Sequence, residues 1–191
     1  MEIEPARVRL HRALRAHRPA DAQEAASVAE VDALLAGPDD PFTRERAAGH
    51  ITASAFVVDS ARTATLLIWH TKLKRWLQPG GHCEPSDPSL CEAAMREASE
   101  ETGLTAAKLL PALSGDAPFD IDVHAIPARG DVPAHRHHDI RYLFEVVGQG
   151  ALTPEPESAL RWVPLAEVAA LDDASLSRMA RKALGQGHAA T

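Results

Sequence analysis

Three glutamates that lie close together in the sequence are the side chains best suited to chemistry. Glu97, Glu100 and Glu101 belong to a segment with helical character that follows a Gly80-Gly81 pair. On a helix that turns about 100° per residue, the three carboxylates span roughly 100° and can converge on one point. Carboxylate oxygens are ligands that Mg²⁺ prefers, and glycines let the backbone approach the same point. The pattern therefore predicts a metal site that acts on a phosphate-bearing molecule.

The same segment has a second face that is suited to packing. Helical spacing places a stripe of mostly small or apolar residues on that face, namely Cys91, Ala94, Met95, Ala98 and Thr102. We expect this stripe to pack on a sheet, with Asp87 as the helix N-cap and Gly103 as the C-terminal glycine. A solvated acidic face is the alternative interpretation. Unrelieved repulsion between the glutamates, near a helix C-terminus that disfavours negative charge, favours a bound cation.

The flanking sequence predicts the elements that position this segment. Apolar and β-branched runs bounded by turn residues predict strands at residues 51–58, 65–70, 74–78, 119–127, 140–147 and 162–163. Helical spacing predicts two terminal helices, near residues 165–171 and 175–184. This order of elements predicts an α/β fold in which helices pack on a mixed sheet.

Residues 1–42 are predicted to form a helical N-terminal extension to a main domain at residues 43–191. Apolar residues such as Leu10 and Leu14 recur there at helical spacing, and Pro19 separates two helices. We interpret the extension as an element for packing or for dimerisation, and a homodimer stays open.

The glutamate segment resembles a known family signature. Gly81, Asp87 and the run REASEETGL at residues 96–104 are similar to the box of Nudix hydrolases, G-x5-E-x7-R-E-U-x-E-E-x-G-U, where U is an aliphatic residue. The chain departs from the box because Asp87 replaces the first glutamate and Pro88 adds one residue before Arg96. The core pattern RExxEExG is intact. The resemblance implies a Nudix-type α/β/α sandwich with a mixed sheet.

The resemblance also implies a reaction and its ligands. Nudix hydrolases cleave a diphosphate linkage in a nucleoside diphosphate-type substrate with the help of Mg²⁺ or Mn²⁺. By this resemblance the metal ligands are Gly80, Glu97, Glu100 and Glu101. Arg96, Glu97 and Glu100 take catalytic roles, with Arg96 orienting Glu97 through a charge-assisted hydrogen bond.

A general base and two competing functions complete what the resemblance implies. The base is expected on a later loop, at Glu157 with Glu155 as its substitute, and a solvated loop acid is an equal alternative. A Nudix-fold domain that senses nucleotides without turnover is the main alternative function. An isomerase of this fold needs a catalytic cysteine in its own motif, whereas Cys83 lies inside the box.

Histidines gather in the middle of the chain and have no single interpretation. They are His50, His70, His82, His124, His135, His137 and His138. His135 and His137 share a face if their segment is extended, and His124 can join them from a neighbouring strand. Substrate contact, a second metal site and ordinary hydrogen bonding all stay open, because imidazole suits each of them.

Two further side chains are candidates for substrate binding. Arg141 alternates with apolar neighbours in its predicted strand and points either to a cleft, where it suits phosphate, or to solvent. Trp76 either stacks on a base or packs in the core. With His135 and His137, these two residues form the expected substrate-binding set.

Composition limits the class of partner and the compartment. The formal net charge of -7 argues against nucleic-acid binding, which needs a basic footprint. Two cysteines cannot form a disulfide framework, and no apolar run approaches the length of a membrane span. We therefore expect a cytoplasmic protein that acts on a small phosphorylated molecule and has no membrane partner. The resemblance implies that this molecule is a nucleotide.

Overall fold

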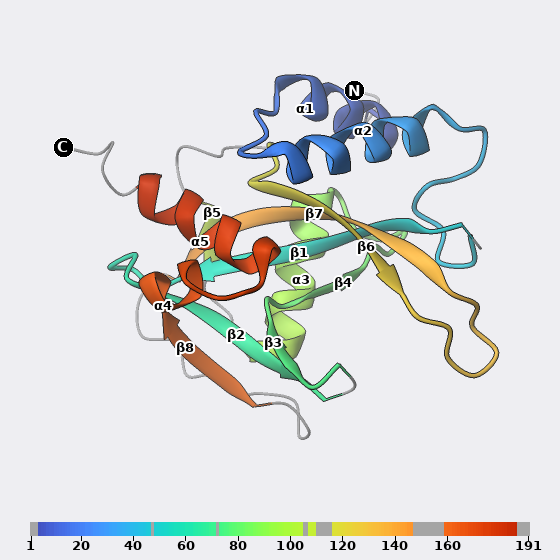
Figure 1. Cartoon of the computed structure of the whole chain (residues 1–191). Coiled ribbons are helices and arrows are strands. Elements are labelled where there is room, and N and C mark those ends of the chain that lie inside the picture. The colour runs from blue at the N-terminus through green and yellow to red at the C-terminus, as the bar shows by residue number, and fades with distance from the viewer. Residues whose placement is uncertain are drawn as a thin grey trace.

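The computed structural model of the chain describes residues 4–46, 48–71, 73–104, 107–109, 116–146 and 159–186 (Figure 1). The helices are Ala6–Ala16 (α1), Ala22–Ala36 (α2), Leu90–Thr102 (α3), Leu165–Ala169 (α4) and Ala174–Gln186 (α5). The strands are His50–Val58 (β1), Ala64–His70 (β2), Arg75–Leu77 (β3), Gly80–His82 (β4), Ala107–Leu109 (β5), Asp120–Ile126 (β6), His135–Val146 (β7) and Leu160–Pro164 (β8).

The described strands form one mixed sheet. Its main path runs β3-β2-β1-β7-β5, while β4, β6 and β8 pair with β1, β7 and β2 respectively. The central strands β1 and β7 are parallel from His50 to Val58, and the other described pairings are antiparallel. Figure 1 shows α3 behind this sheet, with α4 and α5 in front of it and α1 and α2 above β6 and β7.

The alternation of side chains along β1 builds two cores. Ile51, Ala53 and others on the same face pack with apolar residues of α1, α2 and α3. Phe56 and Val58, on the opposite face, pack with residues of α4 and α5. Because successive strand residues point to opposite faces, the sheet is buried between helices on both sides. The predicted α/β architecture with a mixed sheet is therefore confirmed.

The N-terminal helices are part of this core. Leu10 and Leu14 of α1, with Val31 of α2, are buried in the same cluster as α3. The predicted break near Pro19 is confirmed, and Asp21 caps α2 by accepting a hydrogen bond from the Glu24 amide. Packing is thus the role that the contacts show for this extension. In the described part of the chain, no helix has the length and apolar character needed to cross a membrane.

One prediction about the glutamate segment is wrong, and one strand beside it was not predicted. Gly80–His82 pairs with β1 as strand β4. The N-cap of α3 is Ser89, whose side chain accepts from the amide of Glu92, so Asp87 is not the cap. The extra residue of the box moves the helix start beyond Asp87 and leaves this carboxylate to other partners. The predicted C-terminal glycine is confirmed, since Gly103 has φ 71°.

A buried ionic network fastens α5 to the sheet. Arg141 on β7 is 3% exposed and donates to Asp139 at 2.8 Å, and to Asp120 and Asp122 at 3.2 Å each. Arg178 of α5 donates to both Asp120 oxygens, at 2.8 and 2.9 Å. Opposite charges with several hydrogen bonds each offset the desolvation that burial imposes, so loss of one partner would leave a costly unpaired charge.

A second ionic contact joins α2 to β6 and α5. Glu24 is fully buried and accepts from His17 at 2.8 Å, from the amides of Ala20 and Ile121, and from Lys182. Burial alone raises the pKa of Glu24, but these hydrogen bonds outweigh it and lower the pKa from 4.5 to about 2. The ionised form of Glu24 is therefore favoured by folding.

The depressed pKa of Glu24 predicts acid sensitivity. The contribution of Glu24 to stability is complete above its unfolded pKa of 4.5 and is lost as the pH falls towards about 2. We expect urea titrations to show that Glu24→Gln lowers the free energy of unfolding at pH 7, and that this difference from the wild type shrinks by about 1–3 kcal/mol at low pH. The exposed Glu167 provides the control Glu167→Gln. A pH-independent difference for Glu24→Gln would contradict the assignment.

Candidate active site and metal centre

Arg96 is the centre of the glutamate site. Its guanidinium donates to both oxygens of Asp87, at 3.0 and 3.1 Å, and to the carbonyl of His82 at 2.9 Å. It also donates to Glu97 and Glu100, at 3.1 Å each. One side chain of α3 therefore ties together the loop before the helix, strand β4 and two of the predicted metal ligands.

Asp87 is the anchor that holds Arg96 in place. Burial raises the pKa of Asp87, but the hydrogen bonds from Arg96 and from the Glu84 amide, together with the charge of Arg96, outweigh burial and bring the pKa below its usual range. The hydrogen bond to Asp87 is also the main reason why the pKa of Arg96 is raised. A bidentate pair of this kind fixes the guanidinium plane. The sequence signal for this contact was available, because the box places an acid before the arginine, but we interpreted that acid as a cap.

Glu97 lies against strand β4 where a glycine is required. A Cβ atom at Gly81 would lie 2.5 Å from Oε2 of Glu97, so any larger residue would displace this carboxylate. The Glu97 side chain is only 17% exposed. Burial raises the pKa of Glu97, the Arg96 contact lowers it, and repulsion from Glu100 adds to the increase. The glycine thus positions a half-buried carboxylate whose ionised form is disfavoured by burial and by Glu100.

Glu100 and Glu101, on the same helix as Glu97, differ in their surroundings. The Glu100 side chain is 56% exposed, and Glu101 accepts from the amide of Gly80 at 2.9 Å. Gly80 itself lies against Ser54, and its φ of +155° adds to the need for glycine.

This oxygen-rich set is chemically suited to a hard divalent cation. Among the described residues the three glutamates do not form as tight a group as three histidines do. The hydrogen bonds explain why the three carboxylates are apart, because Arg96 donates to Glu97 and Glu100 while the Gly80 amide donates to Glu101.

The histidines form a cluster at one end of the same sheet. In the register of the strands, His50 of β1 lies beside His137 of β7, which in turn lies beside His124 of β6. The ring centroid of His50 lies 5.0 Å from the centroids of His82 and His137, and 5.3 Å from the centroid of His135. The predicted sharing of one face by His135 and His137 is confirmed, with ring centroids 5.2 Å apart.

Burial favours the neutral form of three of these imidazoles, those of His50, His82 and His137. Burial, followed by repulsion from neighbouring histidines, lowers the pKa of His50 to about 4 and the pKa of His137 to about 3. Burial is also the main reason why the pKa of His82 is lowered. Neutral imidazole is the form that binds metals through a ring nitrogen.

The other predicted site residues have different surroundings. Arg141, which was expected at a cleft or in solvent, is buried among three carboxylates, so its guanidinium is not free for substrate. Trp76 is half-buried, and its ring centroid lies 5.5 Å from that of Trp69 in an edge-to-face contact. Glu157 and Glu155 lie outside the described residues.

Cys83 has none of the properties of a nucleophile. It is half-buried, and burial raises the pKa of its thiol to about 12. The thiolate is the reactive form of cysteine, and a thiol with a raised pKa forms little thiolate at neutral pH. This environment argues against the isomerase interpretation.

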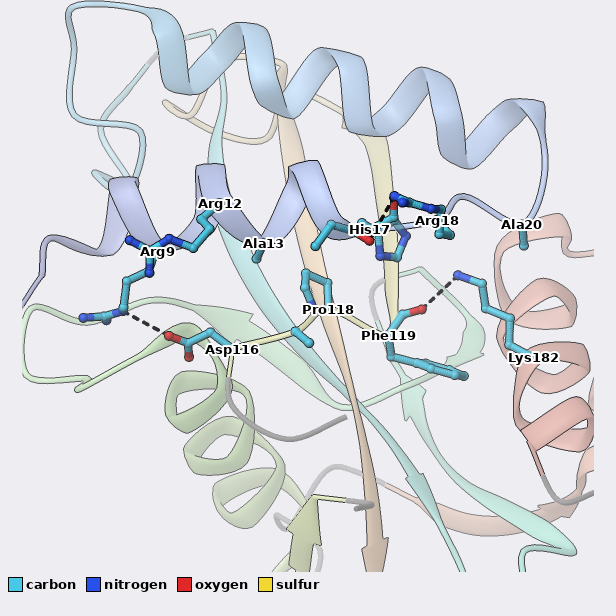
Figure 2. A pocket seen from close by; sticks show the side chains of 12 residues that line it. Arg9, Arg12, Ala13, His17, Arg18, Ala20, Asp116, Pro118, Phe119 and Lys182 are labelled. Atoms are coloured by element: carbon cyan, nitrogen blue, oxygen red, sulfur yellow. Dashed lines mark hydrogen bonds and ion pairs between the residues drawn. The ribbon is translucent and has the colours of Figure 1, made fainter. Parts of the chain in front are cut away.

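A cavity of about 710 Å³ lies away from the glutamate site, between α1, the segment 116–119 that precedes β6, and α5 (Figure 2). Two of its cationic side chains have acidic partners, because Arg9 forms an ion pair with Asp116 at 3.0 Å and Lys182 with Asp120 at 2.8 Å. Arg18, which also lines the cavity, donates to the backbone carbonyls of Ala16 and His17. None of the residues that line this cavity belongs to α3 or β4.

Comparisons with known proteins agree with this geometry. The NUDIX domain matches residues 49–182. Among solved structures, a Caenorhabditis elegans Ap4A hydrolase binary complex is similar with a TM-score of 0.54 and 19% identity, covering 72% of this chain and 98% of that one. The Escherichia coli dihydroneopterin triphosphate pyrophosphohydrolase is similar with a TM-score of 0.52 and 12% identity, covering 71% and 95%. No curated protein matches the sequence.

The family match covers most of the chain, including α3 and the whole described sheet. The chain therefore belongs to the NUDIX domain family. The two solved structures support the fold alone at these identities. The match begins after α2, which fits the predicted division near residue 42, although the boundary itself stays a prediction.

The anchoring role of Asp87 predicts a stability difference between two acids that face the same arginine. Asp87→Ala should lower the free energy of unfolding by about 1–2 kcal/mol, because it removes a bidentate partner from a half-buried guanidinium. Glu84 lies 3.9 Å from Arg96 and is 57% exposed, so Glu84→Ala should cost less than about 0.5 kcal/mol. Denaturant titrations measure both values, and equal losses would contradict the anchor.

Proposed function

We propose that this protein is a metal-dependent hydrolase that cleaves a diphosphate linkage in a nucleoside diphosphate-type substrate. The observation that carries the proposal is the Glu97 carboxylate, which is held between Arg96 and a glycine on which it lies directly. Membership of the NUDIX domain family supports the same class of reaction. The negative net charge is consistent with a small-molecule substrate and not with nucleic acid.

Glu97, Glu100 and Glu101, with the carbonyl of Gly80, are the groups that we propose to hold Mg²⁺ or Mn²⁺. When bound, such an ion neutralises the diphosphate and lowers the pKa of a water molecule that it holds. The side chains provide hard oxygen donors, and Gly80 and Gly81 keep the backbone close to them.

Other residues orient the proposed metal ligands or accept a proton. Arg96 fixes the direction of the Glu97 carboxylate, and Asp87 fixes Arg96 in turn. We retain Glu157, with Glu155 as its substitute, as the proposed general base that removes a proton from the attacking water. Trp76 is retained as a proposed contact for the base of the nucleotide, because it is only half-buried.

Hydrolysis of a panel of nucleoside diphosphate compounds tests this function. We expect Mg²⁺-dependent release of phosphate or nucleotide by the wild type, and a fall in kcat/KM of at least about 100-fold in Glu97→Gln and Glu100→Gln, since even changes behind a metal ligand cost 10–100-fold. Glu92 is exposed on the first turn of the same helix, so Glu92→Gln is the control and should keep its activity.

Two outcomes would count against the hydrolase. If the wild type and both variants are equally inert across the panel, the catalytic assignment fails. If the wild type binds a nucleotide tightly and forms no product, the sensing domain becomes the better description.

The glycine at position 81 gives an independent test of the metal site. Gly81→Ala should displace the Glu97 carboxylate, because the added Cβ would lie 2.5 Å from its oxygen. We expect a 10- to 100-fold loss of Mn²⁺ affinity by titration calorimetry, a loss of the size seen when ligand orientation is disturbed. Gly185 in α5 has open space around its Cβ position, so Gly185→Ala should leave the affinity unchanged. Unaltered Mn²⁺ affinity in Gly81→Ala would place the metal elsewhere.

A further inference from the structure

The histidine cluster contains a group with the spacing of metal ligands. One ring nitrogen from each of His50, His135 and His137 lies within 4.8 Å of the other two. Two nitrogens bound to one tetrahedral Zn²⁺ at 2.0–2.1 Å are roughly 3.4 Å apart, so small side-chain rotations would close the group. His135 begins strand β7 and is half-exposed, which gives its ring room for such a rotation.

His50 is an unusual buried side chain. It is 1% exposed, and neither of its ring nitrogens has a hydrogen-bond partner among the described residues. A buried polar group that lacks a hydrogen-bond partner destabilises the folded state. Its ring faces His82, His135 and His137 at centroid distances of 5.0–5.3 Å. A ligand at the centre of the cluster would use a nitrogen that the protein leaves without a partner.

His135 is already oriented for coordination. Its Nδ1 lies 2.9 Å from the carbonyl of Pro133, and a carbonyl can only accept, so Nδ1 carries the proton. Nε2 of His135 then presents its lone pair. A backbone carbonyl that fixes the tautomer of a histidine is the usual support behind a metal-bound imidazole.

The nearby carboxylates are engaged elsewhere, so the ligand set is made of nitrogen. Asp139 accepts from Thr52, Ser54 and Arg141, at 2.8–3.0 Å. Asp122 forms ion pairs with Arg141 and, through another oxygen, with Arg178. Imidazole ligands suit Zn²⁺ and its transition-metal neighbours, whereas Mg²⁺ and Ca²⁺ require oxygen.

We propose that His50, His135 and His137 bind a transition-metal ion of the Zn²⁺ type at a site separate from the glutamates of α3. Three imidazoles fill three positions of a tetrahedral ion. The fourth is left to water or to the neighbouring His82, whose ring lies 5.3 Å from that of His137. This site does not depend on whether α3 catalyses hydrolysis, because it shares no side chain with that helix.

Metal titration of the full chain tests the site. Chelator-treated protein is titrated with Zn²⁺ in excess Mg²⁺, which occupies the glutamates, and bound zinc is counted by mass spectrometry after dialysis. Co²⁺ serves as a spectroscopic probe, since nitrogen ligands at low coordination number give it much stronger visible absorption than octahedral oxygen ligands do. We expect one Zn²⁺ per chain and a strong Co²⁺ spectrum.

Variants separate this site from adventitious binding. His135→Ala and His137→Ala should each weaken Zn²⁺ binding by at least about tenfold, the lower limit for disturbing even the support of a ligand. His11 lies in α1, where it pairs with Asp32, so His11→Ala is the matched control and should bind as the wild type does. Circular dichroism confirms that each variant is folded, and the half-exposed His135 allows the additional variant His135→Gln.

Zinc binding that depends on the cluster histidines and survives Glu100→Gln supports the site. Absence of stoichiometric zinc, or zinc binding that is equal in His135→Ala, His135→Gln and the control, overturns it. Zinc that is lost on Glu100→Gln and kept in His137→Ala also overturns it, because the ion would then occupy the glutamate site.

Discussion

The site depends above all on one guanidinium. Arg96 donates to Asp87 in the preceding loop, to the His82 carbonyl in β4, and to Glu97 and Glu100 in its own helix. Three acids that would repel one another are therefore held around a fixed positive charge. The same contacts set the distance between α3 and β4, and hence the place where the glycine strand meets the Glu97 carboxylate. A lysine could supply the charge but not the planar set of donors that these contacts use.

The sequence was informative where spacing decides structure and less so where partners come from distant strands. The helical wheel separates the buried stripe of α3 from its acidic arc, and the structure agrees, with Cys91 and Ala98 buried and Glu100 exposed. The strands were mostly located to within a few residues. Strand β4 was missed because glycines carry no strand preference of their own, and its pairing with β1 supplies the order instead.

The electrostatic partners could not be predicted in the same way. Arg141 alternates with apolar residues in the sequence, which is compatible with either a cleft or solvent. Its actual position follows from Asp120 and Asp122 on β6. Because β6 pairs with β7, these two carboxylates lie next to the Arg141 guanidinium and form ion pairs with it. The role of Asp87 was missed for a related reason, since the sequence suits a helix cap as well as an arginine partner. Local patterns thus identified the charged residues, and tertiary contacts determined which of them pair.

The parallel pairing of β1 and β7 has a consequence for the growing chain. β1 lies at the centre of the sheet, but its partner over His50–Val58 comes from His135–Val146, far along the sequence. While the ribosome is still synthesising the intervening segment, one long, mostly apolar edge of β1 has no strand to cover it. Such an edge can pair with another nascent chain, and long-range parallel pairing forms slowly. The interval before β7 emerges is therefore when this edge is most open to pairing with the wrong strand.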